Sequence, residues 1–331
     1  MIDLNRIYNE DCLEGMKRIP DGSVDCILTD PPYLYLKNQK LDRPFDEQIF
    51  FSECKRVLRK DGFIVLFGRG TSFYRWNCIL ADMGFTFKEE IVWDKSYCSS
   101  PMMALSRVHE TISMHTLGNG IIKKVKIPYM EMKGHDIDSV ICDVKRLIPA
   151  LKNTKSLDEV LNYLETNRKY LEAKRVDKYT VSTQSGTKQI SRTAAIMSAI
   201  KEGMNERTII RTDYKEAERP NNVATRHNLS TGDRCCNVMQ SITFGMNEKT
   251  IIKQPREHYK TIHPTQKPVR LLERLLNLVC KEGDTVLDPF SGSASTAIAC
   301  INTKRNYIGF EIDKEYHELS VKRINDLNTC L

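Results

Sequence analysis

The sequence predicts an α/β fold with a mostly parallel central sheet, and three observations support this fold class. Short apolar runs alternate with segments of helical spacing through residues 1–118. These runs are too continuous for strands with one exposed face, so we expect helices to cover both faces of the sheet. The same alternation resumes in residues 258–331, after a segment of different composition at 119–257. We therefore expect one α/β domain with residues 119–257 inserted into it.

In the first part of the chain, strands and helices alternate from near the N-terminus. Asp46 is expected to cap a helix that runs to Lys60, because its carboxylate can accept hydrogen bonds from the first N–H groups. Gly62 is placed to end this helix. The other elements expected here are a short helix after Cys12, strands at 24–28, 63–67, 85–93 and 110–115, and a helix at 71–83.

The last part of the chain continues this pattern. Pro268 suits the first turn of a helix that ends near Gly283, and Asp313 is expected to cap the final helix. Strands are expected at 285–287 and 306–310. A turn of small residues follows the first of these strands, and it lets a ligand approach the backbone closely.

Composition places the chain among ordinary globular proteins. Its 331 residues are 40% apolar, which is enough for a real core. The 11 cysteines include no C-x-x-C pair, so we interpret them as reduced thiols in a cytoplasm. No apolar run approaches the roughly 20 residues of a membrane span, and the N-terminus carries no export signal. We therefore expect a cytoplasmic protein with no membrane partner.

The net charge of +7 is concentrated in the middle of the chain. Residues 121–260 contain 26 Lys and Arg against 17 Asp and Glu, whereas the remainder contains 24 against 26. A basic insert is typical of a polyanion-binding region, because phosphate contacts supply most of the non-specific affinity for DNA. A lysine-rich solvated surface is the alternative interpretation. The candidate DNA-binding residues are the isolated arginines of the insert, Arg192, Arg207, Arg211, Arg226 and Arg234.

A polar motif, Thr29-Asp30-Pro31-Pro32-Tyr33, follows the first of the expected strands. Open α/β folds bind their ligands at this carboxyl edge of the sheet. Asp30 supplies an acceptor-only carboxylate, and the two prolines fix φ and hold the local carbonyl groups as further acceptors. Tyr33 offers a flat face on which a base can stack, a contact worth roughly 1–3 kcal/mol. Two fixed acceptors beside a ring suit the exocyclic amino group of a nucleobase.

Two more acids, Asp288 and Glu311, are expected at the ends of later strands. An acid after the second strand of such a unit commonly binds ribose hydroxyl groups, which makes NAD the default ligand. The turn after Leu287 is not G-x-G-x-x-G, however, and the chain contains no G-x-x-x-x-G-K-[ST], so nothing here is built to bind a pyrophosphate. S-adenosyl-L-methionine has a ribose and no phosphates, and Asp288 is placed to bind its α-ammonium group.

These motifs and their order resemble the β-class of amino-group DNA methyltransferases. The resemblance covers about residues 4–115 and 258–325. It rests on three motifs, which are DPPY at 30–33, HPTQKP at 263–268 and DPFSGS at 288–293. It implies a Rossmann-like fold that depends on S-adenosyl-L-methionine, with a circularly permuted motif order. The catalytic half would be 1–118, the inserted target-recognition region 119–257, and the cofactor-binding half 258–331.

The resemblance also implies roles for single residues. Asp30 and the Pro31 carbonyl would hold the target amino group beside Pro32, while Tyr33 stacks on a flipped-out base. Thr265 and Lys267 would line the methionine end of the cofactor, which Asp30 also borders. The other cofactor-binding residues that it implies are Asp11, Cys12, Asp288, Phe290, Gly292, Ser293, Ala294, Glu311 and Ile312.

Some residues depart from the family pattern or receive no role. Ala294 stands where the family usually has a second glycine, and alanine is tolerable there if φ is negative. Glu10 stands where glycine is common. The segment from Trp93 to Lys95 resembles one beside the target base, but a tryptophan at a strand end is more often packing. We assign no chemistry to Glu110 and the histidine before it, because they form no metal-binding pattern.

The function implied is methyl transfer from S-adenosyl-L-methionine to the N6 amino group of adenine in double-stranded DNA. Adenine is favoured because an acid, Asp30, opens the motif, whereas cytosine-N4 enzymes of this class more often have serine there. Cytosine-N4 methylation, methylation of RNA or protein, and an inactive DNA-binding scaffold stay open as alternatives. The resemblance suggests a homodimer and a cognate restriction endonuclease as protein partners, and the cytoplasm of a bacterial or phage-infected cell as the location.

Overall fold

The computed structural model describes residues 2–33, 43–95, 108–133, 140–141, 144, 161, 241–255, 261–263 and 265–328. The chain divides into two compact units. The first unit comprises Met1–Val125 together with Lys249–Leu331, and the second comprises Lys126–Glu248. The strand at Ile251–Lys253, which falls within the predicted insert, therefore belongs to the first unit.

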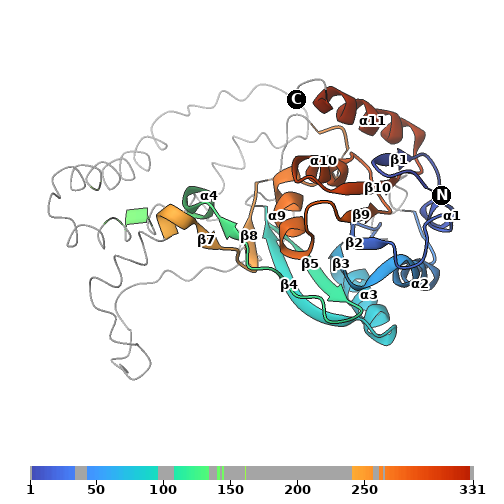
Figure 1. Cartoon of the computed structure of the whole chain (residues 1–331), viewed down its shortest axis with the longest axis horizontal. Coiled ribbons are helices and arrows are strands. Elements are labelled where there is room, and N and C mark those ends of the chain that lie inside the picture. The colour runs from blue at the N-terminus through green and yellow to red at the C-terminus, as the bar shows by residue number, and fades with distance from the viewer. Residues whose placement is uncertain are drawn as a thin grey trace, which may run out of the picture. The chain divides into compact units, whose positions relative to one another are not determined.

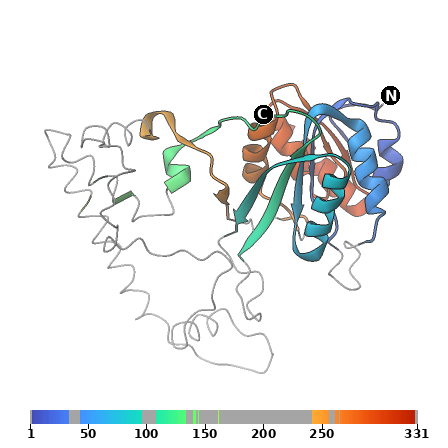
Figure 2. The ribbon, with the colours of Figure 1, turned by 90° about the horizontal axis from the view of Figure 1, so that it is seen from below.

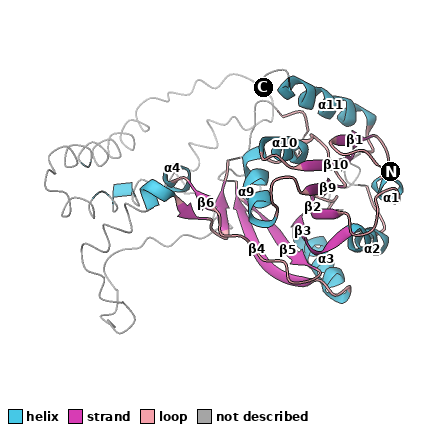
Figure 3. Cartoon of the chain, in the orientation of Figure 1, coloured by secondary structure: helices cyan, strands magenta, loops and turns pink. Residues whose placement is uncertain are grey.

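An eight-stranded sheet forms the centre of the first unit (Figures 1 and 3). Its strands are β1 (Arg6–Tyr8), β2 (Val24–Thr29), β3 (Leu58–Gly68), β4 (Thr86–Asp94), β5 (His109–Thr116), β8 (Ile251–Lys253), β9 (Thr285–Asp288) and β10 (Asn306–Phe310). Their order across the sheet is β1-β10-β9-β2-β3-β5-β4-β8. All neighbours are parallel except at β5, which is antiparallel to β3 and β4. The prediction of a mostly parallel sheet is confirmed.

Helices cover both faces of this sheet (Figure 2). They are α1 (Cys12–Met16), α2 (Glu47–Val57), α3 (Gly70–Asp82), α9 (Val269–Val279), α10 (Ser295–Asn302) and α11 (Lys314–Asn328). Successive residues of β3 point to opposite faces. Phe63, Val65 and Phe67 pack in an apolar cluster with α9 and α10, whereas Ile64 and Leu66 pack in a second cluster with α1, α2 and α3. The two-faced burial explains why β3 is apolar without interruption from Phe63 to Phe67.

The boundary between α2 and β3 differs from the prediction. Asp46 caps α2 as expected, and its side chain accepts a hydrogen bond from the first turn. The helix ends earlier than predicted, because β3 begins at Leu58, which pairs with Val24 of β2. Gly62 lies within β3 and does not end the helix. A Cβ atom at Gly62 would lie 2.8 Å from the Asp25 carbonyl oxygen, so the close approach of β2 requires glycine here.

The strand directions bring polar residues to one edge of the sheet. β9 ends at Asp288, and Asp30 and Glu311 directly follow β2 and β10. Since β10, β9 and β2 are parallel neighbours, these three carboxylates lie at the same edge. β5 runs in the opposite direction, so its first residues, His109 and Glu110, reach this edge beside the end of β4.

The second unit contains a small antiparallel sheet. β6 (Lys126–Ile127) pairs with β7 (Met246–Asn247), and α4 (Tyr129–Lys133) follows β6 in the chain. Across the described parts of both units, every helix is too short or too polar to cross a membrane.

Candidate active site

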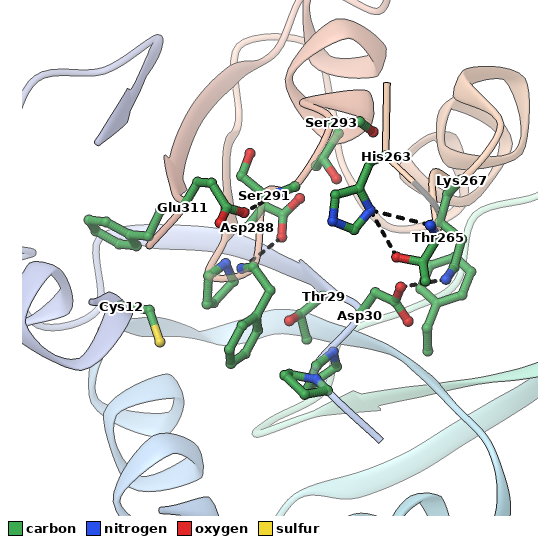
Figure 4. Close-up of a pocket in the computed structure, with 18 of the residues that line it drawn as sticks. Cys12, Thr29, Asp30, His263, Thr265, Lys267, Asp288, Ser291, Ser293 and Glu311 are labelled. Atoms are coloured by element: carbon green, nitrogen blue, oxygen red, sulfur yellow. Dashed lines mark hydrogen bonds and ion pairs between the residues drawn. The ribbon is translucent and has the colours of Figure 1, made fainter. Parts of the chain in front are cut away.

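A cavity of about 550 Å³ opens at the edge of the sheet where the three acids lie (Figure 4). This volume is typical of small-molecule sites. The five arginines predicted to bind DNA lie outside the described residues. Of the predicted catalytic and cofactor-binding residues, those that line the cavity are Asp11, Cys12, Asp30, Pro31, Pro32, Tyr33, Thr265, Lys267, Asp288, Phe290, Gly292, Ser293, Glu311 and Ile312.

Ala294 differs from the other predicted cofactor-binding residues. It is fully buried in the apolar cluster beside α10 and does not line the cavity. Its φ is +62°, so the condition of a negative φ, on which alanine was expected to be tolerated, is not met. The left-handed conformation of a non-glycine residue costs roughly 1–2 kcal/mol. Ala294 therefore contributes to the turn that leads into α10, and its predicted contact with a cofactor stays a prediction.

The turn after β9 forms one wall of the cavity. Gly292 has a φ of +48°, a conformation that glycine adopts readily. Its N–H donates to Glu311 Oε2 at 2.8 Å, and the Asp313 N–H donates to Oε1 at 2.8 Å. Burial raises the pKa of Glu311 above its ordinary value. Because each carboxylate oxygen can accept a second hydrogen bond, Glu311 is held by the backbone and can still bind hydroxyl groups of a ligand.

Asp288 faces the cavity from the end of β9. Its Oδ1 accepts a hydrogen bond from the Phe290 N–H at 3.2 Å. Burial raises the pKa of Asp288 to about 7, although hydrogen bonds from Thr296 and from the Phe290 backbone act in the opposite direction. A cationic group favours the ionised form of a buried acid. The Asp288 carboxylate is therefore suited to an ammonium ligand.

Apolar side chains complete this part of the cavity. Cys12 begins α1, and Asp11 caps that helix with its side chain. Burial raises the pKa of Cys12 to about 12, so the thiol stays protonated. Phe290 packs against Phe45 and Phe50, with ring centroids 5.4 and 5.3 Å apart. These surfaces suit a planar ring, because aromatic and apolar groups exclude water from such a ring.

His263 also lines the cavity, although the sequence analysis gave it no role of its own. Its Nδ1 lies 3.0 Å from Thr265 Oγ1 and accepts from the Thr265 N–H at 3.3 Å. The His263 ring packs edge-on against Tyr316, at 4.4 Å between centroids. His263 thus fixes Thr265. The described residues contain no group of three His, Cys, Asp or Glu side chains that could hold a metal ion.

Asp30 lies on the opposite side of the cavity from Cys12, as Figure 4 shows. Its Oδ1 accepts a hydrogen bond from the Tyr33 hydroxyl at 2.5 Å, and its Oδ2 pairs with the Lys267 ammonium group. Burial raises the pKa of Asp30, and the positive charge of Lys267 lowers it; the balance leaves it above its ordinary value. Lys267, between two acids, has a raised pKa despite its burial.

Two charged residues that the sequence analysis left without a role, Lys95 and Glu110, also line the cavity. Lys95 Nζ donates to Glu110 Oε1 at 3.1 Å, and Lys267 Nζ lies 3.4 Å from Glu110 Oε2. Glu110 belongs to the antiparallel strand β5, so no local pattern could show that it reaches the ligand edge. The available signal for Lys95 was the resemblance of the segment from Trp93 to Lys95 to one beside the target base. Trp93, interpreted as packing, is buried, lines the cavity and donates to the Gln254 carbonyl at 2.7 Å.

Comparisons with known proteins identify relatives over most of the chain. A family model described as DNA methylase (N6_N4_Mtase) matches residues 24–322. The DNA adenine methyltransferase YhdJ of Escherichia coli (strain K12) is 28% identical over 330 residues, which cover 96% of this chain and 82% of that protein. The type II methyltransferase M2.MboI of Moraxella bovis is 46% identical over 69 residues, which cover 21% of this chain and 25% of that protein.

A solved structure also resembles this chain. The crystal structure of the M1.HpyAVI–SAM complex matches with a TM-score of 0.48 and 19% sequence identity. The match covers 96% of this chain and 98% of that chain.

Proposed function

The chain belongs to the DNA methylase family, and on this premise we propose that it methylates the N6 amino group of adenine in double-stranded DNA. The observation that carries the proposal is a single cavity that contains both kinds of group the reaction needs. Asp30 supplies an acceptor for the target amino group, and Asp288 and Glu311 supply acids for the methyl donor. The likeness to a relative named DNA adenine methyltransferase supports adenine as the base.

S-adenosyl-L-methionine is the methyl donor, and the cavity fits it chemically. The buried Asp288 carboxylate, with its pKa near 7, would bind the α-ammonium group, and the oxygens of Glu311 would bind the ribose hydroxyl groups. The apolar surface at Cys12 and Phe290 would hold the adenine ring of the donor. When bound, the donor supplies an electrophilic methyl group. Gly292 carries no side chain, and its positive φ is one that other residues rarely adopt, so the turn would present backbone to the donor.

The chain's own residues would act on the target amine by orienting it. The lone pair of an exocyclic amine is delocalised into the ring, so the nitrogen is a poor nucleophile until its N–H bonds point to fixed acceptors. Asp30 and the Pro31 carbonyl are those acceptors, and Tyr33 would stack on the base. Positioning of this kind can lower a barrier by about 7–11 kcal/mol in favourable cases. The base must leave the duplex first, which costs a few kcal/mol.

The experiment that tests the function is nucleoside mass spectrometry of genomic DNA from a methylation-free bacterial host. The host would express the intact chain or the Asp30→Ala variant. We expect N6-methyladenine with the intact chain and none with Asp30→Ala, while the variant keeps its affinity for DNA. Sequencing of the modified DNA would then give the recognition site.

Other results would overturn this proposal. N4-methylcytosine in place of N6-methyladenine would keep the mechanism and change the base. No modified base from the intact chain, or undiminished methylation by Asp30→Ala, would contradict the assigned function or the assigned role of Asp30, respectively.

DNA is the substrate of this family, and we propose that the basic insert binds it through Arg192, Arg207, Arg211, Arg226 and Arg234. This assignment rests on the excess of positive charge in residues 121–260. We also propose a cytoplasmic location, where DNA and the methyl donor are both present. A second copy of the chain and a cognate endonuclease are the proposed protein partners, and light scattering of the purified chain would test the first of these.

A further inference from the structure

Both oxygens of the Asp30 carboxylate already have partners. Oδ1 accepts the hydrogen bond from the Tyr33 hydroxyl at 2.5 Å, and Oδ2 is paired with the Lys267 ammonium group. An amino group that is to be held by Asp30 must point at one of these oxygens from inside the cavity. Each oxygen keeps a further acceptor position, but an amine that takes the position of the Tyr33 hydroxyl or of the Lys267 ammonium group displaces that partner.

Tyr33 is the more firmly held of the two partners. Its carbonyl oxygen accepts a hydrogen bond from Ser72 Oγ at 2.7 Å, and its ring lies 6.1 Å from the ring of Trp76. Lys267, in contrast, carries its ammonium group on a four-carbon chain and can rotate three donors toward different acceptors. A small movement of Lys267 would uncover Asp30 Oδ2 without any change of the backbone.

A second acceptor lies near the Lys267 ammonium group. Glu110 Oε2 lies 3.4 Å from Lys267 Nζ. This oxygen is buried and accepts no hydrogen bond from any described residue. Its companion, Oε1, accepts from Lys95 Nζ at 3.1 Å, which fixes the carboxylate with Oε2 toward Lys267. The present contact with Lys267 is a long ion pair, so a shift of the ammonium group toward Oε2 would turn it into a charge-assisted hydrogen bond.

We propose that Glu110 is a positioning residue that receives the Lys267 ammonium group when the target amino group takes its place on Asp30. This inference rests on the proposed function, because it requires an amino group in the cavity. After the exchange the Lys267 ammonium group keeps a carboxylate partner in Glu110, while the Asp30 carboxylate accepts its hydrogen bond from the neutral amino group. Burial raises the pKa of Glu110, but Lys267 and Lys95 lower it below its ordinary value, so the acceptor is ionised.

The first test compares Glu110→Gln with the intact chain in single-turnover methylation. The glutamine keeps the shape of the side chain and removes its charge, so Lys267 would stay on Asp30. We expect the methyl-transfer rate to fall about 10- to 100-fold, as for the loss of one buried charged partner. The dissociation constant for S-adenosyl-L-methionine should stay within about 3-fold, because Lys267 keeps its place beside Asp30 in this variant. The matched control is Glu273→Gln, which removes a partly buried ion pair with Arg270 outside the cavity.

A second variant separates positioning from a structural role. Glu110→Gln also leaves the Lys95 ammonium group buried without its partner, which could slow the enzyme through instability alone. The double variant Lys95→Met/Glu110→Gln removes both charges of that pair. We expect it to recover thermal stability while the transfer rate stays low. Recovery of the intact chain's rate in the double variant would overturn the proposal, and so would an unchanged rate in Glu110→Gln.

A third measurement tests whether the effect of Glu110→Gln depends on the amino group of the target base. Once the methylated site is known, a DNA duplex with purine in place of the target adenine offers the same ring without the amine. We expect Glu110→Gln to weaken binding of the adenine duplex but not of the purine duplex, and equal weakening of both would contradict the exchange. If the intact chain methylates nothing, the proposed function fails and this inference with it. If the intact chain and Glu273→Gln are active and Glu110→Gln equals them, only this inference fails.

Discussion

At the scale of single residues, the cavity holds acids whose charge depends on what they bind. Asp288 is the clearest case, because burial raises its pKa from 3.8 to about 7. The folded state therefore binds more protons than the unfolded state between about pH 4 and pH 7. The contribution of Asp288 to the free energy of unfolding is consequently most favourable at low pH and decreases as the pH rises through that window. Above it, the ionised side chain costs the empty protein on the order of 4 kcal/mol.

We expect Asp288→Asn to stabilise the protein in the absence of S-adenosyl-L-methionine at pH 8 and to have little effect at pH 5. The asparagine has no charge to bury, whereas the native aspartate is ionised only at the higher pH. Differential scanning calorimetry at the two pH values measures this difference. The same variant should lose the rise in Tm that the cofactor gives the intact chain, because the carboxylate for its ammonium group is gone. An equal change of Tm at both pH values would show that burial of the charge is not the cause.

At the scale of secondary structure elements, α1 and α2 are joined by one side chain. Arg56, in the last turn of α2, donates to the carbonyl oxygens of Met16 and Ile19, each at 2.8 Å. It also pairs with Asp21 at 2.6 Å and with Glu53 at 2.7 Å. Hydrogen bonds and ion pairs with Glu53 and Asp21 raise the pKa of Arg56 above its ordinary value. A single guanidinium group thus satisfies the C-terminal carbonyl groups after α1 and holds the loop that leads into β2.

We expect Arg56→Ala to lower the free energy of unfolding by about 1–3 kcal/mol, because it removes the charged donor of the part-buried Ile19 carbonyl oxygen; the Met16 carbonyl oxygen keeps a bond from the Ile19 N–H. Urea denaturation of both the variant and the intact chain measures this loss. The control is Arg6→Ala, which removes an exposed pair with Asp3 at 3.7 Å and should cost about 0–1 kcal/mol. Equal losses for the two variants would mean that Arg56 contributes only as a surface charge.

At the scale of the whole molecule, the cavity and the excess of positive charge come from different parts of the chain. The cavity is built from residues of the first unit, whereas the excess of positive charge lies in residues 121–260. A polyanion bound through that excess would release counter-ions, and its affinity would fall as salt is added. Binding of S-adenosyl-L-methionine, for which we propose the buried acids of the first unit, should depend far less on salt.

We expect the double variant Arg207→Ala/Arg211→Ala to bind DNA more weakly at low salt while its affinity for S-adenosyl-L-methionine stays the same. The slope of log K against log salt should become shallower by about 0.9 for each phosphate that the variant no longer neutralises. Fluorescence anisotropy with labelled duplex DNA, over a series of salt concentrations, measures the slope. The control is Lys304→Ala/Lys314→Ala, which removes two exposed positive charges from the first unit. If both double variants change the slope equally, the insert has no special part in DNA binding.

The sequence by itself determined the fold class and identified the three acids and other motif residues that line the cavity. Buried strands could be predicted because burial on both faces leaves a continuous apolar run. Asp46 and Asp313 could be predicted as helix caps because capping depends only on nearby residues. Asp30, Asp288 and Glu311 could be brought together from sequence alone, since parallel strands place their carboxyl ends at one edge. These features depend on neighbours in the chain or on a general rule of topology.

Only the tertiary structure decided the features that depend on pairing between distant segments. The antiparallel direction of β5 brings Glu110 to Asp30 and Lys267, and the pairing of Leu58 with Val24 shortens α2. The left-handed φ of Ala294 is likewise set by the turn and the core around it. Strand direction, register and backbone strain are decided by contacts across the sheet, and a local pattern of apolar residues contains no information about them.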